Sequence, residues 1–161
     1  MIKIAHLADT HCKNLNYHSE YRIVFDKIFE ILKKEKPDII VHCGDLGHTK
    51  TQISPEYVDL ASYFLKNLSN IAPTLIILGN HDCNVRNSFR MDAISPLVDN
   101  INSPNLKLLK YSQEYQFNND VTFNVLGILD KENWKLTPSD PNKINIALYH
   151  GSISGIDTDT G

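Results

Sequence analysis

Long apolar runs are missing from this chain of 161 residues. No stretch approaches the roughly 20 apolar residues with which a helix crosses a bilayer, so we expect no association with membranes. The N-terminus carries one charge and continues directly into an apolar, strand-like pattern, so we also expect no signal peptide. These absences favour a protein of the cytoplasm.

Cysteine is also scarce. The chain has three cysteines, and an odd number without a secretory signal excludes a disulfide framework and indicates a reducing compartment. Cys12, Cys43 and Cys83 each adjoin one of the motifs described below. Thiolates at these positions could bind a soft metal such as Zn²⁺, but we favour small buried residues that pack beneath the motifs.

An excess of positive charge is missing as well, because the formal net charge is −3. Domains that bind nucleic acids usually carry a basic surface. Bound divalent cations would, however, supply positive charge at the place where a phosphate approaches. The charge balance therefore neither indicates nor excludes a nucleic-acid partner.

What the sequence does contain is four short apolar runs, each followed by residues of the types that bind metal ions. The runs cover residues 2–8, 38–43, 74–78 and 144–149. Apolar runs of this length, bounded by glycine, aspartate or asparagine, are typical of buried strands. Since the ligand site of an open α/β sheet lies at the carboxyl ends of its strands, we expect the residues after the runs to meet in space.

Amphipathic segments alternate with the first three runs. Apolar residues at helical spacing predict one helix over 19–34, which ends before Pro37, and a second from 54 or 55 to about 68. A third, shorter helix is expected over 90–98, bent or interrupted near Pro96. The other extended segments are expected at 106–110, 114–117 and 121–128, with a hairpin turn at 118–120 and a loop over 131–143. Alternating strands and helices, in a chain long enough for one domain, predict an α/β fold.

The residues after the runs can bind two metal ions. Asp9 and His11 stand two apart at a strand end, so their side chains project to the same side and can bind one ion. Asp45 follows a glycine, and its carboxylate has two oxygens that can bridge two cations. Asn80 offers an amide oxygen and His150 an imidazole nitrogen. Mixed ligands of this kind suit Mn²⁺, Fe²⁺ or Zn²⁺ better than Ca²⁺, so we predict a two-metal hydrolase.

Each motif alone has an ordinary structural explanation. The triplet Asp9-Thr10-His11 occurs in turns by chance, Asp45 could belong to a turn or a helix cap, and His150 could be a plain strand-end histidine. The segment Gly79-Asn80-His81-Asp82 is more specific, because a turn does not need all four identities. Four motifs in this order, each after a strand, favour the metal site.

Two basic groups lie outside these motifs. Arg86 and Arg90 follow the third motif, where they could clamp a phosphate, and exposed surface positions without that role are an equal alternative. Lys33, Lys34 and Lys36 could also mark a phosphate contact, but we favour a solvated last helical turn that complements the helix dipole.

In their order and identity, the motifs resemble the calcineurin-like metallophosphoesterases. The pattern of that family is Asp-x-His, Gly-Asp, Gly-Asn-His-(Asp/Glu), His and finally Gly-His-x-His. The segments that begin at His6, Gly44 and Gly79 are most similar to SbcD-type DNA-repair and recombination nucleases, including those of phages. The resemblance extends from Lys3 to about Gly155.

The resemblance implies a role for each site residue. Asp9 and His11 would bind the first metal ion, Asp45 would bridge both ions, and Asn80 and His150 would bind the second. The expected metal is Mn²⁺, with Fe²⁺ or Zn²⁺ as alternatives.

Three further residues receive catalytic roles from the resemblance. His81 would contact the scissile phosphate and protonate the leaving oxygen, with Asp82 orienting its ring. His48 would lie beside the substrate. The chemistry is reasonable, because a histidine with its ordinary pKa of about 6.5 is a suitable general acid.

The resemblance also implies the fold and function. Two facing sheets flanked by helices would form one phosphoesterase domain over residues 1–161, truncated at its C-terminus. The chain would hydrolyse DNA phosphodiester bonds, as exonuclease and endonuclease, in double-strand-break repair or recombination. Its partners would be DNA, an SbcC-type coiled-coil ATPase and a second copy of the chain. It would act in the cytoplasm, which would be the host cytoplasm if a phage encodes the chain. A phosphodiesterase for small nucleotides, a protein phosphatase and a non-catalytic fragment or assembly module are the alternatives.

One motif of the pattern is missing. No Gly-His-x-His follows His150, and the remaining histidines do not replace it, because His6 and His42 lie in predicted strands and His18 on the expected surface. We therefore expect an incomplete site with fewer than two tightly bound ions. A fragment, a split gene and a shortened relative remain open as explanations.

Overall fold

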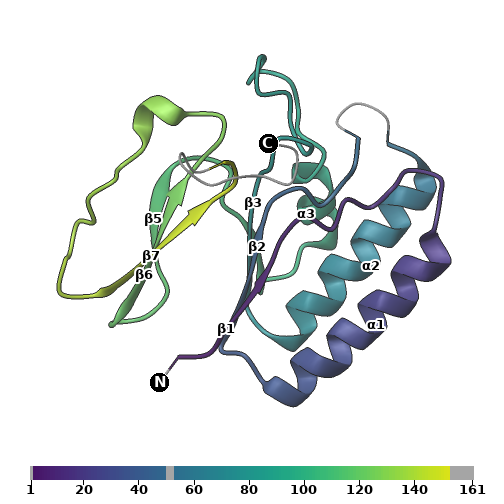
Figure 1. Cartoon of the computed structure of the whole chain (residues 1–161), viewed down its shortest axis with the longest axis horizontal. Helices are drawn as coiled ribbons and strands as arrows, with labels where there is room; N and C mark the ends of the chain where they lie inside the picture. The colour runs from purple at the N-terminus through teal and green to yellow at the C-terminus, as the bar shows by residue number, and fades with distance from the viewer. Residues whose placement is uncertain (1, 50–52, 153–161) are drawn as a thin grey trace.

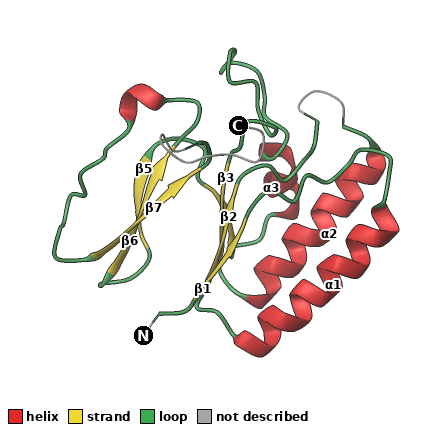
Figure 2. Ribbon diagram, viewed as in Figure 1, coloured by secondary structure: helices red, strands yellow, loops and turns green. Residues whose placement is uncertain are grey.

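The computed structural model describes residues 2–49 and 53–152 and stacks them in three layers: helices, a four-stranded sheet and a three-stranded sheet (Figure 1). All three α-helices of the described residues cover the same side of the larger sheet (Figure 2). In chain order the elements are β1 Ile4–Leu7, α1 His18–Glu35, β2 Ile39–Cys43, α2 Pro55–Ile71, β3 Thr74–Ile77, α3 Ser95–Ile101, β4 Leu106–Leu108, β5 Gln113–Gln116, β6 Val121–Leu126, the short 3₁₀ helix η1 Lys131–Asn133 and β7 Ile144–Tyr149. The predicted α/β fold with two sheets is thus observed. The end of the predicted domain, residues 153–161, lies outside the described residues.

The larger sheet is parallel throughout, in the order β1-β2-β3-β4. The strands β2 and β3 are buried at every position because one face meets the helices and the other meets the second sheet. Ile40 packs with the helices, whereas Ile39 and Val41 pack with Phe123 of the second sheet. Successive side chains of β2 therefore point alternately into the two hydrophobic cores, and this one apolar strand contributes to both.

The smaller sheet combines a hairpin with a parallel strand. The strands β5 and β6 are antiparallel across the predicted turn, in which the side chain of Asn118 accepts hydrogen bonds from the backbone N–H groups of Asp120 and Val121. The strand β7 pairs in parallel with β6, from Val121↔Ile144 to Leu126↔Tyr149. Because β7 runs this way, its carboxyl end reaches the carboxyl ends of β2 and β3 (Figure 1).

The helix ends lie within about three residues of the expectations, except at the start of α3. Ser54 caps α2 by accepting a hydrogen bond from the N–H of Tyr57. The helix α3, however, begins at Ser95 instead of residue 90, so Pro96 lies in its first turn and does not interrupt it. The carboxylate of Asp92 accepts hydrogen bonds from the N–H groups of Ile94 and Ser95, which fixes the later start.

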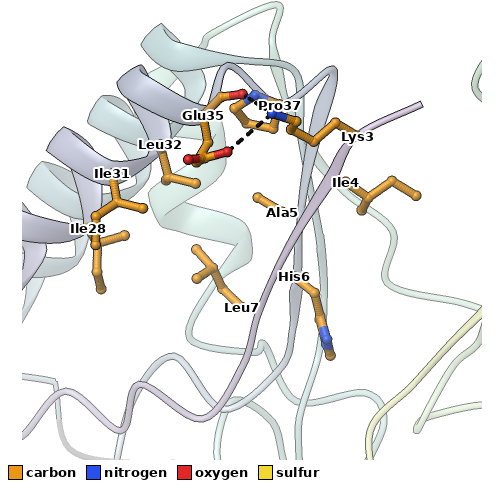
Figure 3. Close-up of a pocket in the computed structure, with 10 residues that line it drawn as sticks. All are labelled: Lys3, Ile4, Ala5, His6, Leu7, Ile28, Ile31, Leu32, Glu35 and Pro37. Carbon is orange, nitrogen blue, oxygen red and sulfur yellow. Dashed lines mark hydrogen bonds and ion pairs between the residues drawn. The ribbon is translucent and has the colours of Figure 1, made fainter. Parts of the chain in front are cut away.

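An apolar pocket of about 420 Å³ lies beside β1 at the edge of the larger sheet (Figure 3). Ala5 and Leu7 point toward α1, whereas His6 points to the other side of the strand (Figure 3). Lys3 closes one end by hydrogen bonds from its Nζ to the carbonyl oxygen and a carboxylate oxygen of Glu35.

Within the described residues, no helix is long and apolar enough to cross a membrane.

Candidate metal centre

The loops that follow β1, β2, β3 and β7 meet at one end of the two sheets. The backbone N–H groups of Asp9 and His11 donate to the carbonyl oxygens of Gly44 and Asp45, both at 3.0 Å. The imidazole of His150, which follows β7, lies 2.8 Å from the carbonyl oxygen of Cys43 through its Nδ1. Topology thus brings together residues that are far apart in the sequence, as the strand pattern predicted.

Unusual backbone angles aim these side chains. Asp9, His11 and Asp45 all have positive φ, between 45° and 55°, in the left-handed region. Gly44 has φ of 88°, and a Cβ there would lie 2.7 Å from the Cα of Gly79. A Cβ on Gly79 would in turn lie 2.1 Å from Oδ1 of Asp45. The loops after β2 and β3 therefore need glycine at both positions to approach this closely.

The first three predicted metal ligands form one group. Nε2 of His11 lies 3.7 Å from Oδ1 of Asp9 and 3.6 Å from Oδ2 of Asp45. One ligand atom from each residue lies within 4.8 Å of the others, as binding to a common ion requires. Nδ1 of His11 is buried and has no hydrogen-bond partner among the described residues, so Nε2 is the nitrogen of this ring that faces the two carboxylates and could bind an ion.

The other two predicted ligands, Asn80 and His150, also lie close to Asp45. Nε2 of His150 is 3.3 Å from Oδ2 of Asp45 and 3.0 Å from Oδ1 of Asn80. The same carboxylate oxygen of Asp45 therefore lies between the imidazoles of His11 and His150. This is the arrangement expected of a carboxylate that serves two metal ions.

The charges of Asp45 and His150 depend on each other. Burial alone would raise the pKa of Asp45, but hydrogen bonds from His150 and from the backbone N–H of His81 outweigh it and lower the pKa. The hydrogen bond with Asp45 raises the pKa of His150 to about 9. A proton shared with the carboxylate of Asp45 thus holds His150 in place, and a metal ion that binds here would have to displace this proton.

His81 and His48 face the same end of the sheet as His11. Nδ1 of His81 lies 2.7 Å from the carbonyl oxygen of His48, and its ring centroid is 4.9 Å from that of His11. The ring of His48 is 5.7 Å from that of His81, and its side chain is exposed. The three imidazoles each offer a nitrogen within 4.8 Å of the others, so they form a second group of metal-ligand type.

Asp82 does not orient the ring of His81, contrary to our expectation. Its fully buried carboxylate accepts backbone N–H groups from Asp45 at 2.7 Å, Gly79 at 2.9 Å and Gly47 at 3.2 Å. The carbonyl oxygen of His48 takes the place beside Nδ1 of His81 instead. Burial raises the pKa of Asp82 to about 6, despite these three donors.

The three cysteines are packing residues. Cys12, Cys43 and Cys83 are all buried. Burial raises the pKa of Cys12 to about 12 and that of Cys43 to about 11, so both thiols remain protonated. The burial of all three agrees with the packing role that we favoured from the sequence.

A polar pocket of about 370 Å³ opens over the site. Four of the predicted ligands line it, namely Asp9, Asp45, Asn80 and His150. His6 and Tyr149 also line the pocket, and sequence reasoning did not assign either to the site. Their one signal was position, because His6 points to the same side of β1 as Ala8 and Tyr149 precedes His150. Carboxylate, amide and imidazole groups at one pocket fit a divalent transition-metal ion.

Comparisons with known proteins agree with this geometry. A family profile described as calcineurin-like phosphoesterase matches residues 2–160. An uncharacterised protein of Acanthamoeba polyphaga mimivirus is 43% identical over 98% of this chain, which covers 13% of that protein.

A DNA-repair protein and a nuclease subunit are similar over about half of the chain. The DNA double-strand break repair protein Mre11 of Saccharolobus solfataricus is 30% identical over 55% of this chain and 25% of its own length. The SbcD component of the nuclease SbcCD of Staphylococcus saprophyticus is 35% identical over 53% of this chain and 24% of its own length. The chain thus matches a quarter or less of each of these three relatives.

Proposed function

Because the chain belongs to the calcineurin-like phosphoesterase family, we propose that it contributes a dinuclear metal site for hydrolysis of DNA phosphodiester bonds. The position of Asp45 carries the proposal, since its Oδ2 lies 3.6 Å from Nε2 of His11 and 3.3 Å from Nε2 of His150. Similarity to Mre11 and to the SbcD component of SbcCD supports DNA as the substrate. Double-strand-break repair or recombination is the proposed setting.

Five residues would bind the metal ions. Asp9 and His11 would bind one ion, Asn80 and His150 the other, and Asp45 both. When bound, two divalent cations activate water and neutralise charge on the phosphoryl oxygens. We propose Mn²⁺ first, with Fe²⁺ or Zn²⁺ as alternatives.

His81 would act on the leaving group. Its Nδ1 lies beside the carbonyl oxygen of His48. Because a carbonyl oxygen can only accept a hydrogen bond, Nδ1 carries a proton and donates it to this bond. Nε2 is therefore the ring nitrogen that can take up and release a proton. Protonated at Nε2, His81 would donate this proton to the departing oxygen. His48, with an exposed ring beside that of His81, would contact the substrate.

A comparison of two substrates tests the proposal. The full chain is incubated with Mn²⁺ and either linear DNA or bis(p-nitrophenyl) phosphate, with the Asp45→Asn variant as the matched control. Metal-dependent cleavage of DNA by the native chain and not by the variant is expected. Hydrolysis of the small ester with the DNA left intact would overturn the nuclease proposal and favour a small-molecule phosphodiesterase.

A non-catalytic role, the alternative that the sequence pattern left open, is the second candidate. In that case the chain would act as an assembly module whose site a second polypeptide completes. Mn²⁺ titration distinguishes the two roles, because an incomplete site should bind fewer than two ions tightly. Two firmly bound ions together with full turnover would exclude the non-catalytic role.

The proposed partners follow from the same similarity. A second copy of the chain and an SbcC-type coiled-coil ATPase are proposed, in the cytoplasm of the cell or of a phage host. Sedimentation of the chain alone and with such an ATPase would test both. A monomer that does not bind the ATPase would contradict them.

A further inference from the structure

The segment 84–91, here called the β3–α3 loop, projects beyond the carboxyl ends of the strands (Figure 1). It begins two residues after Asp82 and is held by its own turns. The N–H groups of Asn87 and Arg90 donate to the carbonyl oxygens of Asn84 and Asn87 at 3.0 and 3.1 Å. At its base, the N–H of Ala93 donates to the carbonyl oxygen of Asp82 at 2.8 Å. The loop is therefore anchored next to the candidate metal centre.

The loop displays apolar side chains to water. Phe89 is 100% exposed, and Met91 is 74% exposed. No other large apolar side chain of the described residues is as exposed as Phe89. A phenylalanine without any packing partner does not stabilise the fold, so its apolar surface is available to a ligand.

Two unpaired cations accompany this ring. Arg86 and Arg90 are exposed, and within residues 2–49 and 53–152 neither guanidinium makes an ion pair or hydrogen bond. Arg22, by contrast, pairs with Asp59. The acidic residues nearest in sequence to the two arginines, Asp82 and Asp92, are both buried. The loop is thus locally positive although the chain has a net charge of −3.

We propose that the β3–α3 loop binds an unpaired nucleotide of a single-stranded nucleic acid, with Phe89 stacked on the base and Arg86 and Arg90 in contact with phosphates. An exposed aromatic ring beside cations is the combination with which proteins bind single strands. A paired base in a duplex does not offer its face, so an unpaired base is the ligand that fits. The binding itself does not depend on the proposed function. Its purpose, which is to hold the strand near His81, rests on that function.

Binding of a fluorescein-labelled oligo-dT, measured by anisotropy in EDTA, tests the loop without any metal. Phe89→Ala should weaken binding about 5- to 100-fold, the loss expected for one stacked base, and Phe89→Trp should retain it. Arg86→Ala and Arg90→Ala should each lower the slope of log affinity against log salt by about 0.7. Leu136→Ala, at another side chain that is 79% exposed, and Lys33→Ala are the matched controls.

Three results would overturn the proposal: no binding of oligo-dT by the native chain, equal binding by Phe89→Ala, or a Phe89→Ala variant whose main change is its oligomeric state. The last result would make the loop a protein interface. Hydrolysis of bis(p-nitrophenyl) phosphate by the native chain is measured separately. Its absence would count against the proposed hydrolysis, whereas the anisotropy series would still decide the role of Phe89.

Discussion

The carboxylate of Asp82 accepts a hydrogen bond from the backbone N–H of Asp45 at 2.7 Å. This contact ties the turn after β3 to the turn after β2. The same carboxylate accepts the N–H groups of Gly79 and Gly47, so a single buried side chain fixes both turns. Asp82 therefore positions Asp45, which we propose as the shared metal ligand.

Replacement of Asp82 should loosen these turns. Asp82→Ala leaves three buried N–H groups without an acceptor, so we expect the free energy of unfolding to fall by about 3 kcal/mol. Mn²⁺ affinity should fall with it, because Asp45 is no longer held. Urea unfolding and Mn²⁺ titration measure both effects. Asp120→Ala, at an exposed hairpin position, is the control, and an Asp82→Ala variant with native stability would refute the positioning role.

Asp45→Asn should abolish metal binding at both positions. The amide keeps the size of the side chain but replaces one carboxylate oxygen by a donor and removes the charge. Asp9→Asn, by comparison, should weaken only one position. Calorimetric titration with Mn²⁺ compares the two variants. One ion bound tightly by Asp45→Asn would show that this carboxylate does not serve both positions.

Substitution of His81 should separate binding from catalysis. In a catalytically complete version of the site, His81→Gln should lower the rate of DNA cleavage by about 10²- to 10⁴-fold, which is the usual contribution of a general acid. The metal content should stay unchanged. The loss should be smaller with bis(p-nitrophenyl) phosphate, whose leaving group needs less protonation. Metal analysis of the variant is the check, because loss of metal would assign His81 to ligation.

Acid should weaken the fold through Asp92. The carboxylate is 0% exposed and lies 2.8 Å from Nζ of Lys110. Burial alone would raise the pKa of Asp92, but hydrogen bonds from Lys110 and Ser95 outweigh burial and lower it. With a folded-state pKa below the unfolded value of about 3.9, the ionised group stabilises the fold above that pH. This stabilisation is lost as the pH falls through the folded-state pKa.

Asp92→Asn isolates this contribution. The variant should lose about 3 kcal/mol near neutral pH, because it leaves Lys110 without its partner, and should lose less at about pH 3. Urea unfolding at the two pH values measures the difference. Glu35→Gln, in the exposed pair with Lys3, should change stability little. Equal losses for Asp92→Asn at both pH values would contradict the assigned ionisation.

The sequence predicted the strands and the meeting of the five proposed ligand residues, because both follow from local pattern and topology. The strand β7, for example, has the predicted bounds Ile144–Tyr149. The family was likewise predicted from the motifs and is confirmed. These features depend on residues whose role is set by their immediate neighbours.

Features that depend on side-chain direction could not be predicted. Asp82 follows His81 in the sequence, which suggested a contact between their side chains, but the turn buries the carboxylate of Asp82 and leaves the ring of His81 beside His48. Phe89 looked like any aromatic residue, because exposure depends on what packs against it. The start of α3 was missed because the side chain of Asp92, which lies before the helix, binds the N–H groups of Ile94 and Ser95.

The positive φ angles of Asp9, His11 and Asp45 affect how long the backbone amide protons at this end of the sheet resist exchange with solvent. A non-glycine residue held in this region costs about 1–3 kcal/mol, so the reactive end of the sheet stores energy that the middle of β2 does not. Segments with lower local stability open more often. Amide protons near these three residues should therefore exchange within a shorter time than those of Ile40 and Val41, and bound cations would lengthen the time most at that end.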